Sequence, residues 1–123
     1  MAYFGWCAGI WAVAISGRTV NTTSTVKEKN VIKHIVMWTL KNPADIPKMK
    51  QLLESCQAVV PGIAAFEVGV RSEGLEANAD VVLYSAFADK AALQAYQQHP
   101  HHLAVAAQIG SMRQTRTVID YEV

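Results

Sequence analysis

The histidines are the side chains of this sequence best suited to chemistry, and three of the four lie close together as His99, His101 and His102. An imidazole has an unperturbed pKa of about 6.5, so it takes up and returns a proton near neutral pH. Imidazole also binds zinc, nickel and copper. The spacing is not that of the helical HExxH zinc motif, and no cysteine or acidic residue completes a ligand set nearby. We therefore predict proton transfer rather than a metal site.

Each histidine also has a purely structural interpretation. His34 stands alone in an apolar strand, where a half-buried and hydrogen-bonded histidine is the simplest explanation. His99 precedes Pro100, which pushes the residue before it out of helical geometry, so we expect His99 to cap the helix that follows. We expect His101 to face solvent. For His102 two alternatives stay open, a catalytic base or a residue that packs at the helix junction.

Composition excludes several classes of protein. The chain has 123 residues, of which 51% are apolar and 17% charged, so a wholly disordered chain is excluded and one folded domain is expected. Eleven basic residues balance ten acidic ones. Binding to nucleic acid or to an anionic membrane needs clustered positive charge, so neither partner is predicted. The two cysteines, Cys7 and Cys56, form neither a disulfide framework nor a CxxC pair, which favours a reducing, cytoplasmic location.

The first thirty residues differ from the rest of the chain. Residues 2–15 are apolar or small and are followed by a polar, Thr-rich stretch. The apolar run is too short to span a bilayer. A secretory signal cleaved after Ala12-Val13-Ala14 is one alternative, but no basic residue precedes Arg18. A start codon near Val31 is another. We treat residues 1–30 as an N-terminal extension and residues 31–123 as the domain.

The domain has the hydrophobic periodicity of alternating strands and helices. Period-two segments rich in β-branched and aromatic residues predict strands, and a period near 3.6 predicts helices. The predicted strands are residues 31–40, 64–72, 80–88 and 116–123. The predicted helices are residues 44–60, 90–98 and 101–109. Asp89 is the expected N-cap of the second helix, and Gly110 is expected to end the third. Cys56 lies on the apolar stripe of the first helix, so we expect it to be buried.

This order is β-α-β-β-α-β with the second helix broken, which is the ferredoxin-like arrangement in the α+β class. It predicts a four-stranded antiparallel sheet with the helices on one face. The open face would carry Val36, Trp38, Phe66, Val68 or their neighbours, and such an apolar patch must be covered. A second copy of the same sheet is the simplest cover, so we expect a homodimer.

Four segments resemble the stress-responsive dimeric α+β barrel (Dabb) family. They are residues 31–38 (VIKHIVMW), 61–63 (PGI), 95–102 (AYQQHPHH) and 118–121 (VIDY). The Tyr-x-x-His-Pro-x-His element is the most specific of them. The resemblance covers residues 31–123, about three quarters of the chain. It implies a homodimeric barrel with a pocket in each protomer, between the sheet and the helices.

The resemblance also implies site residues. In some plant members the pocket houses a polyketide cyclase that performs an aldol condensation without a cofactor, using a tyrosine and a histidine as acid–base pair. By motif position these are Tyr96 and His102, with His34 and Asp120 also at the pocket. A carboxylate such as Asp120 is suited to orient the base. Trp38 shares a strand face with His34, and we assign Val36 and Trp38 to the ligand pocket.

Three functional hypotheses follow. The first is a cofactor-independent protein that binds a hydrophobic carbonyl compound and catalyses cyclisation, isomerisation or lyase chemistry. His102 would be the base, Tyr96 the donor, and His34 and Asp120 the supports. The second is a non-catalytic, stress-associated structural or ligand-binding dimer, in which these residues only pack. The third, haem-degrading or quinol-type monooxygenase activity, rests on fold analogy alone.

Overall fold

A computed structural model describes residues 30–123 of the chain. The predictions made for residues 1–29, including the signal and the alternative start, lie outside the described residues. Among residues 30–123, no helix is long and apolar enough to cross a membrane.

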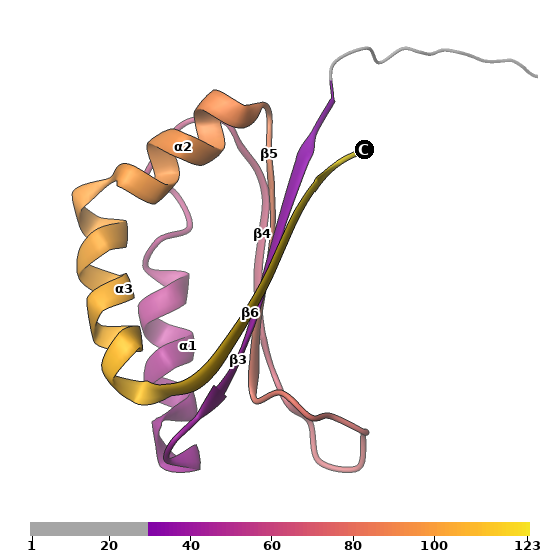
Figure 1. Ribbon diagram of the computed structural model, residues 1–123, viewed down its shortest axis with the longest axis vertical. Coiled ribbons are helices and arrows are strands. Elements are labelled where there is room, and N and C mark those ends of the chain that lie inside the picture. Colours follow the sequence, from indigo (N-terminus) through magenta and orange to yellow (C-terminus); the bar gives the residue numbers. More distant parts are fainter. Residues whose placement is uncertain (1–29) are drawn as a thin grey trace, which may run out of the picture. The chain divides into compact units, whose positions relative to one another are not determined.

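The described residues fold as β-α-β-β-α-β with the second helix broken, which confirms the predicted ferredoxin-like order. The elements are β3 (Ile32–Leu40), the 3-10 turn η1 (Pro43–Asp45), α1 (Ile46–Glu54), β4 (Ile63–Val70), β5 (Val81–Phe87), α2 (Lys90–Gln98), α3 (Pro100–Met112) and β6 (Arg113–Glu122). The strands form one antiparallel sheet in the order β4-β5-β3-β6. The three helices all lie against one face of it, and no helix or strand of residues 30–123 covers the other face (Figure 1).

Strand β3 is central and decides which side chains face the helices. Its alternate residues from Ile32 to Leu40 are buried, including His34, Val36 and Trp38. They lie on the helix side because they belong to the hydrophobic core together with residues of all three helices. Successive strand residues point to opposite faces, so the intervening residues lie on the open face.

The sequence left two alternatives for the open face, a named set of side chains or their neighbours, and the structure selects the neighbours. Val36 is 1% exposed and Trp38 is 5% exposed, and both lie beneath the helices, where Phe66 and Val68 also pack against the core. The open face instead carries their neighbours along the strands. On β3 these are Lys33, Ile35, Met37 and Thr39, paired with Tyr121, Ile119, Thr117 and Thr115 of β6. The sequence could not decide between the two alternatives because period two separates two faces without indicating which one the helices cover.

Helix α1 ends at Glu54, six residues before the predicted end. The Ser55 hydroxyl donates to the Leu52 carbonyl at 2.5 Å, and the Cys56 amide bonds to the Leu53 carbonyl at 3.0 Å. Such local bonds compete with the helical pattern and replace it by turns. Cys56 nevertheless stays fully buried, as its place on the apolar stripe predicted.

Helix α3 continues through Gly110 to Met112, so the prediction that Gly110 ends it is wrong. Gly110 does not have a positive φ. Ile109 and Met112 are buried in the core, and this packing holds the last turn in place. As a result β6 begins at Arg113 rather than at Arg116.

The junctions before α2 and between α2 and α3 are fixed by capping side chains. The Asp89 carboxylate accepts from the Ala92 amide at 2.8 Å, as predicted for an N-cap. His99 has extended backbone geometry, and its Nδ1 accepts from the His101 amide at 3.0 Å. Pro100 occupies the first turn of α3, where its missing N–H costs nothing. The chain therefore turns sharply at His99 while both helix ends stay satisfied.

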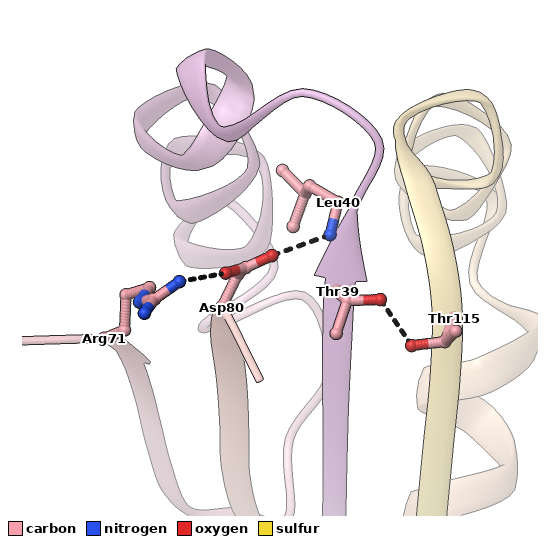
Figure 2. A network of polar contacts seen from close by, with 5 residues as sticks. All are labelled: Thr39, Leu40, Arg71, Asp80 and Thr115. Atoms are coloured by element: carbon pink, nitrogen blue, oxygen red, sulfur yellow. Dashed lines mark hydrogen bonds and ion pairs between the residues drawn. The ribbon is translucent and has the colours of Figure 1, made fainter. Parts of the chain in front are cut away.

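The ends of β3, β4 and β5 are joined by Asp80, just before β5 (Figure 2). Its carboxylate accepts from the Leu40 amide at 2.9 Å and pairs with Arg71 at 3.2 Å. Its own amide donates to the Trp38 carbonyl at 2.8 Å. On the other side of β3, the hydroxyls of Thr39 and Thr115 lie 2.5 Å apart. These contacts fix the end of β3 that carries Trp38.

We expect Asp80→Ala to lower the free energy of unfolding by about 1–3 kcal/mol, because it leaves the Leu40 amide without its acceptor and Arg71 without its counter-ion. Asp80→Asn, which keeps an acceptor oxygen, should cost less. Urea unfolding of both variants measures this. A free energy of unfolding close to that of the wild type in both variants would show that this network does not stabilise the ends of these strands.

Candidate functional site

A cavity of about 270 Å³ lies between the sheet and the helices. Its wall comes from β3, β5 and β6 on one side and from α1, α2, α3 and the turn after α1 on the other. The lining residues are His34, Val36, Trp38, Leu53, Cys56, Leu83, Tyr96, His102, Val105, Ala106, Ile109, Arg113 and Arg116. Small-molecule sites have this character, an apolar wall with a few polar groups.

The helix break brings Tyr96 and His102 together. Tyr96 lies near the end of α2 and His102 in the first turn of α3, and their ring centroids are 4.5 Å apart at an angle of 57°. Tyr96 is only 1% exposed and packs against the rings of Phe66 and Phe87. An unbroken helix would separate residues six positions apart by nearly two turns, about 9 Å. The His99-Pro100 turn therefore makes the contact between the two rings.

The proton on neutral His102 has a fixed place. Its Nδ1 lies 3.1 Å from the Gln97 carbonyl oxygen, which only accepts, so Nδ1 carries the hydrogen and donates it. In the neutral ring Nε2 then has the free lone pair. Burial lowers the pKa of His102 from its ordinary value of 6.5, and the nearby His34 and Arg116 lower this pKa further against the opposing effect of the Gln97 bond. At neutral pH His102 is thus a neutral ring with a vacant base position.

The phenol of Tyr96 is shifted the opposite way. Burial raises its pKa well above the ordinary value of 10.0, and the neighbouring Cys56 raises this pKa further. The Tyr96 hydroxyl therefore stays protonated and is a hydrogen-bond donor at any physiological pH. Burial likewise raises the pKa of the Cys56 thiol, so the sulfur is not a ready nucleophile.

His34 and Asp120 form a pair on adjacent strands. They are opposite each other in the β3–β6 register, with His34 Nδ1 2.5 Å from Asp120 Oδ1. His34 is 3% exposed, and the ring centroids of His34 and Tyr96 are 6.4 Å apart. The sequence analysis suggested that Asp120 orients His102. The structure instead places Asp120 on His34, outside the cavity wall, while a backbone carbonyl orients His102.

The structure leaves the other two histidines outside the cavity. His99 is the N-cap described above, and the exposed His101 has its Nε2 2.8 Å from the Ser55 hydroxyl. Among residues 30–123, no group of three or more histidine, cysteine or acidic side chains is arranged to hold a metal ion.

Besides apolar side chains, the sequence analysis missed three wall residues that carry chemical groups, Cys56, Arg113 and Arg116. Cys56 was assigned only to the core. Arg113 and Arg116 belong to no recognisable anion-binding motif, since no Gly-rich phosphate loop accompanies them. The sequence did contain one indication that Arg116 lies at the site. Arg116 lies four residues before Asp120 on the same strand, so period two places both on one face.

The chain matches the family description "Stress responsive A/B Barrel Domain", Dabb, over residues 32–123. The chain belongs to the Dabb family. The match spans the whole described domain, including the residues that line the cavity. Among curated proteins no match was found.

Solved structures share the fold. A dimeric ferredoxin-like protein from Bacteroides fragilis is 26% identical, with a TM-score of 0.65 over 76% of this chain and 96% of that one. A Dabb family protein from Mesorhizobium loti is 27% identical, with a TM-score of 0.59 over 76% and 96% of the two chains. A hydroxynitrile lyase from Passiflora edulis is 17% identical, with a TM-score of 0.66 over 77% and 94%.

The lowered pKa of His102 makes stability pH-dependent. Between the two pKa values the unfolded chain binds more protons at this ring than the folded chain does, so stability rises with pH there. We expect the His102 contribution to be complete above pH 6.5 and to be lost as pH falls towards the folded-state pKa. NMR titration of the ring should give a pKa below 6.5, and the corresponding pH slope should vanish in His102→Gln. A ring pKa above 6.5 would contradict this assignment.

Proposed function

We propose that this Dabb protein forms a homodimer and, in a pocket in each protomer, catalyses a cofactor-independent acid–base reaction on a hydrophobic carbonyl compound. The observation that carries the proposal is the Tyr96–His102 contact on the cavity wall. One ring is held neutral with a vacant base position, and the other is held as a protonated donor. An enolising enzyme needs these two groups side by side.

The reaction begins with removal of a proton from the carbon next to the substrate carbonyl. His102 Nε2 takes that proton, the C–H electron pair becomes the new C=C bond, and the π pair of the carbonyl moves to the oxygen to give an enolate. The Tyr96 hydroxyl donates a hydrogen bond to that oxygen, which stabilises the developing charge. The enolate then attacks a second carbonyl in a cyclisation, regains a proton elsewhere in an isomerisation, or expels a leaving group in a lyase reaction.

The buried His34 supports this arrangement. The Asp120 carboxylate accepts from Nδ1, which fixes the ring and its tautomer. The Ser85 hydroxyl bonds to the His34 carbonyl at 2.8 Å and so holds the backbone at this point. His34 thus presents a second, rigid polar group to the cavity, near Tyr96. Val36 and Trp38 supply apolar wall next to it on the same strand face.

We infer the homodimer from the open face of the sheet. Ile119 is 56% exposed, Tyr121 41% and Met37 40%, and all three point away from the helices. An apolar sheet face is unfavourable in water unless another surface covers it. The Bacteroides fragilis relative is described as dimeric, and a second copy covers a face of this kind through two-fold symmetry.

A non-catalytic dimer is the second candidate. Tyr96 is among the largest fully buried side chains and packs on Phe66, Phe87 and His102, as a core residue would. In that case the tyrosine and the histidine contribute only to stability.

We expect the protein to accelerate exchange of the α-hydrogens of benzylacetone with deuterated solvent, followed by NMR. His102→Gln should reduce this exchange by about 10²–10⁴-fold, and Tyr96→Phe should also reduce it, because one removes the base and the other the donor. The wild-type rate should rise with pH through the pKa of His102 and then level off.

His101→Gln is the matched control, because His101 is an exposed histidine outside the cavity, and it should keep the wild-type rate. Exchange no faster than in protein-free buffer, together with a loss of unfolding free energy in both His102→Gln and Tyr96→Phe, would favour the non-catalytic dimer.

We expect Ile119→Lys to convert the dimer to a monomer in light scattering, because it places a charge on the face that the second copy covers. Leu103→Lys is the control, since Leu103 is equally exposed, at 55%, but lies on α3 in the helix layer. A dimer that survives Ile119→Lys but dissociates with Leu103→Lys would place the interface on the helices.

A further inference from the structure

Two arginines line the cavity without counter-ions. Arg113 and Arg116 both belong to its wall, and no acidic residue in residues 30–123 shares that wall. Within the described part of the chain, the basic and acidic side chains that lie within 4.0 Å of each other are His34 and Asp120, Lys50 and Glu54, and Arg71 and Asp80, so neither arginine has a carboxylate at that distance. The cavity therefore carries two positive charges, and no acidic side chain among residues 30–123 pairs with them.

The backbones of the two arginines lie towards the other end of the cavity from the acid–base pair, although the charge of Arg116 still acts on His102. His102 is in the first turn of α3 and Arg113 follows its last turn, so about 16 Å of helix rise separates them. Arg116 pairs with Trp38 across the β3–β6 ladder, whereas Asp120 pairs with His34, about 13 Å further along the strand. The wall between the two ends includes the apolar side chains of Val36, Leu83, Val105 and Ile109.

Trp38 provides a second, independent observation at the arginine end. Its side chain forms part of the wall, and the residue is only 5% exposed. Its indole Nε1 is buried and has no hydrogen-bond partner among the described residues. A buried N–H without an acceptor is unfavourable, so an acceptor supplied by a bound ligand would improve this site.

We propose that Arg113 and Arg116 bind a carboxylate of the substrate at this end of the cavity, with Trp38 Nε1 as an additional donor. The inference rests on the proposed function and narrows its substrate class. The substrate is then an amphipathic keto acid. The carbonyl lies against Tyr96 and His102, an apolar middle part crosses the cavity, and the carboxylate meets the guanidinium groups. A guanidinium donates two parallel N–H bonds, which matches the two oxygens of a carboxylate.

Binding at one end is coupled to the base at the other. The positive charge of Arg116 contributes to the lowered pKa of His102. A carboxylate on Arg116 neutralises that charge, so a bound keto acid raises the pKa of His102 towards its ordinary value, whereas a neutral ligand leaves this contribution unchanged. The base thus becomes stronger when a charged substrate is present.

The test compares 7-oxooctanoate, a keto acid in which five methylene groups separate the carbonyl from the carboxylate, with its neutral primary amide by calorimetry on the full chain. We expect the acid to bind at least about tenfold more tightly than the amide, as charge-assisted bonds allow. Arg116→Gln and Arg113→Gln should each weaken binding of the acid by about tenfold and that of the amide by less than about twofold. Lys48→Gln, which removes the same charge from an exposed position outside the cavity, should change neither.

The outcomes separate this inference from the proposed function. Equal binding of acid and amide would overturn the carboxylate site while leaving the pocket, and binding of neither ligand would overturn both. A preference for the acid that persists in both arginine variants would overturn the assignment to these residues. Tighter binding of the corresponding phosphonate would overturn the carboxylate assignment and would indicate a ligand with a phosphate group. A rise in the NMR-measured pKa of His102 that occurs with the acid and not with the amide would support the proposal, because binding of the acid at the protein surface would not cause it.

Discussion

The register of β3 between β5 and β6 is the constraint on which the rest of the domain depends. It places His34, Val36 and Trp38 under the helices, and it places Asp120 and Arg116 of β6 opposite the first and last of them. A slip of one residue would bring Lys33 and Ile35 into the core and turn His34 outwards. The Asp80 contacts at one end of β3 and the His34–Asp120 pair nearer the other hold the strand in this register. The same interactions that stabilise the sheet thus position the polar wall of the cavity.

Burial has opposite effects on two groups that lie side by side, and this gives the site its division of roles. Removing water penalises the charged form of any side chain. For an imidazole the charged form is the protonated one, so His102 becomes a neutral base, and for a phenol it is the deprotonated one, so Tyr96 stays a donor. Neither role needs a metal or a strong ion pair beside it. The backbone carbonyl of Gln97 then selects the His102 tautomer, a task that a carboxylate performs in many other sites.

The sequence predicted the element order, the Asp89 cap and the buried position of Cys56, because these follow from local periodicity and local hydrogen-bonding groups. It did not predict which face of β3 the helices cover or that Asp120 contacts His34. The first depends on how the helices pack on the sheet, and the second on strand pairing between residues 86 positions apart in the chain. The ends of α1 and α3 were also wrong, for opposite reasons. Hydrogen bonding around Ser55 and Cys56 ended α1 early, whereas burial of Ile109 and Met112 carried α3 past a glycine.

The continuation of α3 has a consequence for the cavity. Because the helix runs to Met112, Arg113 becomes its C-cap residue, and its amide donates to the Ile109 carbonyl. The chain then enters β6 at once, so Arg113 and Arg116 are held at one end of the cavity by a helix terminus and by the β3–β6 ladder. Both side chains line the cavity, Arg113 as a half-buried residue and Arg116 as one that also contacts solvent. Fixed positive charge at the end of an apolar cavity favours a ligand with one charged end, and the rigid backbone on both sides lowers the entropic cost of binding it.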